Sequence, residues 1–299
     1  MSDSTTERAI DRAALLRWQQ RQAQIPGPPW LHGEVARRMA ERLQIMKRVP
    51  TVVIDWWSRN GASHELLRAA YPRARQLRVE PAAVMQRPKA AAAWWSAQRW
   101  RTNDAVAESA VPDGRAQLLW ANMMLHAVAD PGALLSQWRR ALSMEGFVMF
   151  STLGPDTLAT LRQTYRDAGW GAAHAPFVDM HDLGDMLVRA GFADPVMDQE
   201  MLRLTWATPA ALRAELRGLG VNADPARCAG LRTPRWRARL DAALAERAGA
   251  DGRIALEFEI VYGHAFNPPP RVAVAGETRL SAADLQRMAR TGRKGASLG

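Results

Sequence analysis

The sequence predicts an α/β fold of the Rossmann-like type, with a helical arm in front of it and a helical insertion before the last strand. Two stretches carry this prediction. Residues 51–80 read as strand, turn, helix and strand, with an acid near the end of each strand. Residues 117–154 read as a buried strand, a polar turn, an amphipathic helix and a second buried strand. Strands that alternate with helices in this way are typical of a parallel sheet.

The chain before the first strand supplies the arm and one helix. Residues 1–28 are mostly polar and run into the stiff break Ile25-Pro-Gly-Pro-Pro29. Residues 30–46 form a predicted amphipathic helix, because apolar side chains recur on one face and charged ones on the other. A short buried strand over 51–55 follows.

The first half of the sheet continues with a helix over 63–71 and a strand over 75–80. Residues 81–112 have a weaker pattern. They suggest an Ala-rich helix around 90–95 and a strand near Ala105.

The second half starts with a strand that ends in Trp120-Ala121-Asn122. Its last side chains are expected at the carboxyl edge of the sheet, where ligands bind in this kind of fold. Asp130 and Pro131 begin a helix, as a capping carboxylate and a proline in the first turn. Gly146 is expected to end that helix, and residues 147–150 return to the sheet.

The rest of the chain completes one predicted domain. Its elements are helices over 157–168 and 181–190, a strand over 200–206, two helices in an insertion over 208–250, and a last strand over 254–262. The domain therefore spans residues 29–266. The basic tail over 267–299 is expected to be mobile.

The composition is that of a globular protein, with 47% hydrophobic and 23% charged residues in 299. No apolar run approaches the roughly 18 to 20 residues of a membrane span, and the N-terminus lacks the apolar core of a secretion signal. We therefore expect a cytoplasmic location and no membrane partner. The single cysteine, Cys228, excludes an intrachain disulfide and a thiolate metal cluster.

The net charge of +10 is carried almost entirely by arginine, since only three of the 40 basic residues are lysines. One explanation is a coding bias towards GC-rich codons. Another is an acidic partner protein that an Arg-rich face attracts. Nucleic acid is not expected, because the chain has no nucleic-acid-binding signature and no basic stripe interleaved with aromatic residues.

Several runs of residues resemble one known family. The block over 117–154 resembles the half of a class I S-adenosylmethionine (SAM) methyltransferase that follows the cofactor motif. Further runs are similar to BioC, the malonyl-acyl-carrier-protein O-methyltransferases of biotin synthesis: 150–158, 177–185, 190–196 and 259–265. The likeness covers about residues 29–266. A related branch, the methyltransferase-like assembly factors of respiratory complex I that hydroxylate arginine, shares the Asp-Thr-Leu and Leu-Gly elements.

The resemblance implies a class I SAM methyltransferase fold and S-adenosyl-L-methionine as cofactor. It also implies an activity, methylation of the free carboxylate of malonyl carried on acyl carrier protein. Two alternatives stay open. The chain could be a non-catalytic relative that acts as an assembly or interaction protein, or a methyltransferase with another acceptor. The oligomeric state is not predicted.

The same resemblance points to a set of cofactor-binding residues. Asp55 and Glu80 stand where the family has its two acids, and Gly61 is the last glycine of the turn between them. Asn122 and Met123 follow the fourth strand, where they are expected to border the cofactor.

The turn after Asp55 departs from the family pattern, which is usually Asp-x-Gly-x-Gly-x-Gly. This chain has Asp55-Trp-Trp-Ser-Arg-Asn-Gly61. Either Trp56 and Trp57 pack on the sheet and the turn still binds the cofactor, or the indoles fill the site where glycines would allow close approach. Asp104 is the nearest candidate for a third acid beside the adenine.

The other candidates are chosen from chemistry and position. An Arg fork best holds a malonyl carboxylate, and Arg162 and Arg203 lie in the lid-like region, with His181 as a third substrate-binding candidate. His174, Asp179 and His181 together could suggest a metal, but Asp179 is expected to cap a helix, so no metal is predicted. No catalytic residue is assigned, because methyl transfer from a sulfonium depends mainly on positioning and exclusion of water.

Overall fold

The computed structural model describes residues 7–22, 24–25, 27–85 and 105–269. Its strands are β1 Val52–Trp56, β2 Arg75–Glu80, β3 Ala105–Ala107, β4 Ala116–Ala121, β5 Leu142–Leu153, β6 Ala193–Trp206 and β7 Ile254–Phe266. Its α-helices are α1 Arg12–Gln22, α2 Trp30–Glu41, α3 Ser58–Gly61, α4 His64–Ala70, α5 Ala82–Met85, α6 Pro131–Ala141, α7 Ala159–Asp167, α8 Met180–Arg189, α9 Pro209–Leu219 and α10 Pro234–Ala245. Short 3-10 turns are η1 Arg42–Ile45, η3 Glu108–Ala110 and η4 Leu125–Ala127.

In this part of the chain the strands form one seven-stranded sheet in the order β3-β2-β1-β4-β5-β7-β6. Strands β1 to β5 pair in parallel, whereas β7 pairs antiparallel with both β5 and β6. The predicted Rossmann-like α/β fold is therefore confirmed. Residues up to Pro268 form one compact unit.

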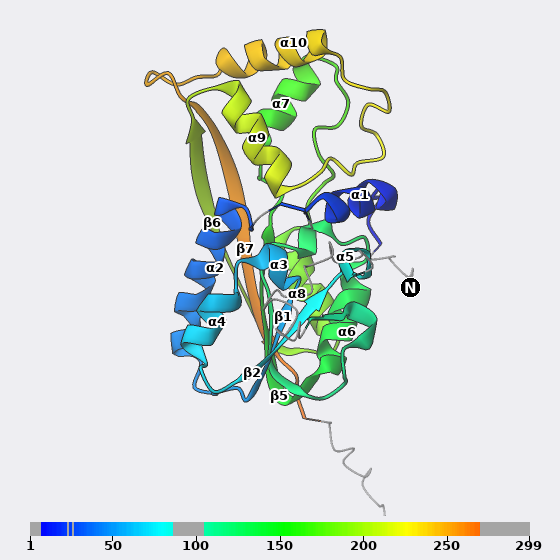
Figure 1. Cartoon of the computed structure of the whole chain (residues 1–299), viewed down its shortest axis with the longest axis vertical. Helices are drawn as coiled ribbons and strands as arrows, with labels where there is room; N and C mark the ends of the chain where they lie inside the picture. The colour runs from blue at the N-terminus through cyan, green and yellow to red at the C-terminus, as the bar shows by residue number, and fades with distance from the viewer. Residues whose placement is uncertain (1–6, 23, 26, 86–104, 270–299) are drawn as a thin grey trace, which may run out of the picture. The chain divides into compact units, whose positions relative to one another are not determined.

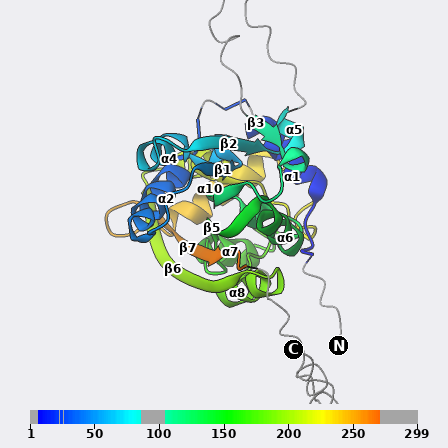
Figure 2. The same cartoon turned by 90° about the horizontal axis from the view of Figure 1, so that it is seen from below.

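Helices cover both faces of the sheet (Figure 2), because the buried strands place apolar side chains alternately on each side. On β4, Leu118 packs with α2 and α4, while the next residue, Leu119, packs with α6 and α8. Near-continuous apolar strands of this kind are typical of a parallel sheet buried on both faces.

Helix α6 begins as predicted, since the Asp130 side chain accepts a hydrogen bond of 2.9 Å from the backbone N–H of Ala133. The prediction that Gly146 ends this helix is wrong, because the helix ends at Ala141 and Gly146 lies inside β5. A Cβ on Gly146 would come within 2.9 Å of the carbonyl oxygens of Ala116 and Ser143. The close approach of the backbone within the sheet requires glycine there. In the sequence, such a glycine cannot be distinguished from one that ends a helix.

The predicted insertion forms a cap at one end of the sheet (Figure 1). Strands β6 and β7 run past the other strands, and α9 and α10 lie between them in the chain. The Arg213 guanidinium donates to both carboxylate oxygens of Asp241, at 2.6 and 3.0 Å, and so joins α9 to α10. Tyr165, Trp170 and Trp236 form an edge-to-face aromatic cluster that ties α7 to the same cap.

Other predicted segments lie outside the described residues. These are the Ala-rich helix around 90–95, Asp104, and all but the first three residues of the tail 267–299. None of the described helices is long and apolar enough to cross a membrane.

Candidate functional site

The carboxyl ends of four parallel strands meet at the edge of the sheet that faces the cap. Asp55 in β1 pairs with Trp120 in β4, and Trp56 pairs with Val79, next to Glu80 at the end of β2. Because parallel strands all end at one edge, the predicted acids and the residues after β4 come together there. This is the edge at which open α/β sheets bind ligands.

Asp55 is completely buried at this edge, and among the described residues its carboxylate oxygens have no hydrogen bond of good geometry. Burial, and then the neighbouring charge of Glu80, raise its pKa well above the ordinary value, while Arg78 and Ser63 lower it less. Burial therefore favours the neutral form of the Asp55 carboxyl.

Glu80 is bound to the turn that follows β1. Its Oε1 accepts hydrogen bonds from the Ser58 hydroxyl at 3.1 Å and from the Arg59 backbone N–H at 2.8 Å. The side chain is buried, and burial raises its pKa. Glu80, which the family resemblance assigns to the cofactor, therefore already has partners within the chain at one of its two oxygens.

The two tryptophans of the turn behave differently. Trp56 is fully buried and packs edge-to-face on Trp138 of α6, with ring centroids 6.0 Å apart. Trp57 has φ 55° and ψ 46°, the left-handed conformation that favours glycine, and its indole N–H donates to Glu108 at 2.7 Å. The backbone at Trp57 therefore adopts a conformation that favours glycine, although the residue carries an indole.

Helix α1 closes the same place from the other side. Trp18 is only 4% exposed and belongs to the apolar cluster that contains Trp57 and Val79. The cavity left between α1, the turn and Glu80 measures about 30 Å³. Pockets for ligands of nucleoside size are on the order of 300 Å³ or more. The acid pair suits a nucleoside cofactor, but the described residues in this conformation leave no room for one.

Asn122 holds the turn to the end of β4. Its amide donates to the carbonyls of His32 at 2.8 Å and Gly61 at 2.6 Å, and its oxygen accepts from the Ser151 hydroxyl at 2.7 Å. Met123 follows with φ 51° and is also buried. These contacts are structural, and the role of Gly61, Asn122 and Met123 in cofactor binding stays a prediction.

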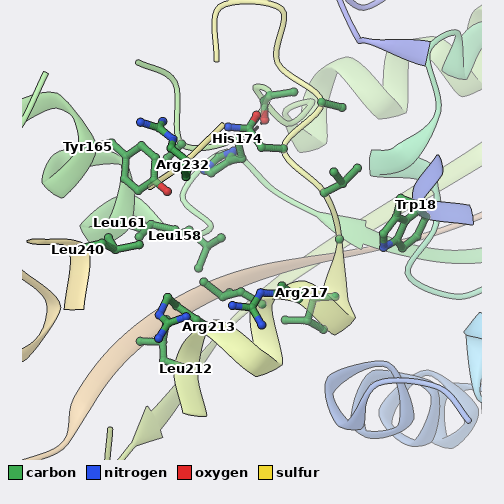
Figure 3. Close-up of a pocket in the computed structure, with 18 of the residues that line it drawn as sticks. Trp18, Leu158, Leu161, Tyr165, His174, Leu212, Arg213, Arg217, Arg232 and Leu240 are labelled. Atoms are coloured by element: carbon green, nitrogen blue, oxygen red, sulfur yellow. Dashed lines mark hydrogen bonds between the residues drawn. The ribbon is translucent and has the colours of Figure 1, made fainter. Parts of the chain in front are cut away.

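A much larger cavity, of about 560 Å³, lies between the edge of the sheet and the cap (Figure 3). Most of its wall is apolar. It runs from Trp18 of α1 towards Tyr165 and Leu240 in the cap. Its polar lining groups are His126, Tyr165, His174, Arg213, Arg217, Asn222, Arg232, Thr233 and Arg237.

The predicted substrate-binding residues lie outside this lining. Arg162 donates to the carbonyl of Pro155, and Arg203 is exposed on β6. His181 is 83% exposed and lies 2.8 Å from Asp179, which caps α8 as predicted. Arg162, Arg203 and His181 therefore stay predictions. No group of three metal-ligating side chains occurs among the described residues.

Two residues at the edge were not selected from the sequence. His126 follows β4 and lines the large cavity, with its Nδ1 3.5 Å from the Thr152 hydroxyl. Burial, and then the neighbours His32 and Arg8, lower the pKa of His126 to about 3. Arg8, from the arm, donates to the carbonyls of His126 at 2.6 Å and Val128 at 3.3 Å. The position of His126 just after a strand end was the only sequence signal, and Arg8 had none.

Comparison with known proteins gives four similarities: one family profile, two relatives and one solved structure. A family profile described as "Methyltransferase domain" matches residues 32–194. The malonyl-[acyl-carrier protein] O-methyltransferase of Laribacter hongkongensis is 38% identical over 252 residues, which cover 81% of this chain and 84% of the relative. That of Halorhodospira halophila is 38% identical over 267 residues, covering 87% and 90%. The YcgJ protein of Bacillus subtilis superposes with a TM-score of 0.50 at 10% identity, covering 79% of this chain and 99% of YcgJ. This last likeness concerns the fold alone.

Proposed function

Because the chain belongs to the malonyl-[acyl-carrier protein] O-methyltransferase family, we propose that it methylates the free carboxylate of a malonyl group carried on acyl carrier protein. The observation that carries this proposal is the 38% identity to two relatives of that name over more than four fifths of the chain. Neither alternative, a non-catalytic relative or another acceptor, has a comparable observation in its favour. A cytoplasmic location is part of the proposal.

S-adenosylmethionine is the methyl donor, and it supplies a methyl group that the positive charge on sulfur has already activated. Trp18 and Trp57 fill the space beside Glu80 in the conformation described, so no contact to the donor is assigned. The chain's own contribution lies on the acceptor side. A carboxylate is itself a nucleophile, so the protein needs only to position it and exclude water.

The cavity under the cap suits an acceptor that reaches in from a carrier protein. Its apolar wall accommodates an acyl thioester arm, and the cap encloses the edge of the sheet at which β1, β2, β4 and β5 end. Exposed arginines on the cap, including Arg217, Arg235 and Arg237, supply positive charge that attracts an acidic carrier. Acyl carrier protein is the proposed partner.

Growth of a biotin-requiring strain that lacks its own methyltransferase tests this function in cells. The gene should restore growth without biotin. Supplying the methylated product, the methyl ester of the malonyl thioester, should make the gene dispensable. Failure to restore growth, with the protein present and folded, would overturn the biotin-type acceptor. Binding of S-adenosylhomocysteine in calorimetry would then distinguish a methyltransferase with another acceptor from a relative that binds no cofactor.

A further inference from the structure

One end of the large cavity lies directly at the carboxyl edge of the sheet. Leu15 and Trp18 of α1 form one side, and Leu153, the last residue of β5, forms another. His126 is a polar lining residue beside β5, since its Nδ1 lies 3.5 Å from the hydroxyl of Thr152, the neighbour of Leu153. In this fold the edge is where a bound molecule meets the residues that follow the strands, so an acceptor must present its reacting group here.

His126 is available to a ligand. Its ring packs edge-to-face on Phe177, with centroids 5.9 Å apart, and its Nδ1 faces Thr152. Among the described residues, Nε2 of His126 has no hydrogen-bond partner. The imidazole is neutral, since its pKa is lowered to about 3, and a neutral imidazole carries one N–H donor.

Arg8 places a half-buried positive charge next to the backbone of His126. Its guanidinium donates to three backbone carbonyls, those of His126, Val128 and Pro176. Burial lowers its pKa to about 10. Within the described part of the chain no carboxylate pairs with it, because the acids on either side bind elsewhere, Glu7 to Arg12 and Asp11 to Arg227. A half-buried guanidinium without a carboxylate partner attracts an anion that binds nearby.

We propose that the free carboxylate of the acceptor binds at this end of the cavity, hydrogen-bonded to His126 and balanced in charge by Arg8. His126 contacts the substrate in this arrangement. Arg8 does not line the cavity, so it acts as a positioning residue through the loop that carries His126. This inference rests on the proposed function and deepens it, because it assigns a binding site for the acceptor carboxylate. The sequence alone did not show which of the many arginines would bind that carboxylate.

Two of the arginines that line the cavity already have partners, and the other two, Arg217 and Arg237, are exposed on the cap. Arg213 is already paired with Asp241, and Arg232 lies over the Trp236 ring at 4.2 Å while donating to the Trp170 carbonyl. Figure 3 shows both arginines towards the cap end, well separated from Trp18. A neutral imidazole donor also affects the reactivity of the carboxylate differently from a guanidinium. A bidentate guanidinium would engage both carboxylate oxygens, whereas one imidazole N–H leaves the other oxygen free to react.

Binding of two carriers to the full-length protein tests the site. Malonyl-acyl carrier protein and acetyl-acyl carrier protein differ at the tip only in the free carboxylate, so the ratio of their dissociation constants isolates it. We expect the wild type to prefer the malonyl form by about tenfold, the effect of one good charge-assisted contact. Arg8→Gln and His126→Leu should bring the ratio close to one.

Conservative variants separate this role from a structural one. Arg8→Lys keeps the charge and His126→Gln keeps an N–H donor, so both should retain most of the preference. Arg68→Gln removes an exposed cation of α4 and should leave the ratio unchanged. A purely structural role for Arg8 would weaken both carriers equally and leave the ratio unchanged, which would overturn the inference.

The outcome for the wild type separates this inference from the proposed function. An unchanged malonyl preference in Arg8→Gln and His126→Leu overturns the inference and leaves the function intact. A wild type without any preference also overturns it. In that case methylation of malonyl-acyl carrier protein decides whether the function survives.

Discussion

The Glu80 carboxylate accepts a hydrogen bond of 2.8 Å from the backbone N–H of Arg59, so the acid that ends β2 fixes the turn that follows β1. Trp57 on the same turn packs with Trp18 of α1. Helix α1, the turn after β1 and Glu80 therefore pack together and cover the site at which the family resemblance places the methyl donor. We expect donor binding to require that the Trp18 indole of α1 moves away from the turn, and the cost of that step would lower the apparent affinity for the donor.

Replacing Trp18 should tighten donor binding. Trp18→Ala removes the indole that closes α1 over the turn, so the open form becomes more populated and the dissociation constant of S-adenosylhomocysteine should fall about tenfold. Calorimetric titration measures the change. Trp30→Ala removes an indole that is 62% exposed and serves as the control. Equal affinities in the wild type and Trp18→Ala would show that α1 does not gate the donor.

The neutral carboxyl of Asp55 predicts a pH dependence of stability. With a raised pKa, the folded chain keeps this proton after the unfolded chain has lost it, so this group's stabilisation is lost as pH rises above its ordinary pKa of 3.8. Asp55→Asn cannot ionise and should raise the free energy of unfolding at pH 8 by about 1 kcal/mol or more. Its advantage over the wild type should shrink at pH 5. Urea unfolding at both pH values checks this, and an advantage that grows at low pH would contradict it.

Removing the Asn122 amide should destabilise the fold. Asn122→Ala removes the hydrogen bonds to the carbonyls of His32 and Gly61 and the acceptor of the Ser151 hydroxyl. The Gly61 carbonyl keeps the Ser63 hydroxyl as a donor. Since each buried hydrogen bond contributes about 1 kcal/mol, the loss should be about 3 kcal/mol. Ser136→Ala, which removes one bond within α6, is the matched control and should cost less than about 1 kcal/mol. Similar denaturation midpoints for the two variants would refute the structural role.

Charge reversal on the cap should weaken docking of the carrier without changing chemistry. Arg235→Glu should raise the KM for malonyl-acyl carrier protein about threefold and reduce its salt dependence, while kcat stays the same. Arg75→Glu is the control. It makes the same change in charge at the first residue of β2, at the edge of the sheet away from the cap. If Arg75→Glu raises KM as much as the cap variant, net charge rather than a docking face is responsible.

Local patterns were sufficient to predict most of the fold. The strand over 75–80 matches β2, and the Asp130 cap begins α6, because alternation and capping depend on neighbours in the sequence. Gly146 was misread because a glycine inside a strand and a glycine after a helix look alike in sequence. Only the β4–β5 packing distinguishes the two cases.

The site was predictable only in part. Asp55 and Glu80 meet because parallel strands end at one edge, which a sequence pattern can anticipate. The contact between Arg8 and His126 joins residues 118 positions apart. No periodicity or spacing encodes such a contact. The left-handed turn at Trp57 was also hidden, because nothing in the residue type favours positive φ.

Intact-mass analysis of malonyl-acyl carrier protein after incubation with the purified full-length chain and S-adenosylmethionine tests the proposed activity most directly. We predict that the wild type adds one methyl group to the carrier, that the product is a base-labile ester, and that acetyl-acyl carrier protein is unmodified. An unchanged mass with both the wild type and Trp18→Ala, in preparations that are folded, would contradict the assignment of methyl transfer to this chain.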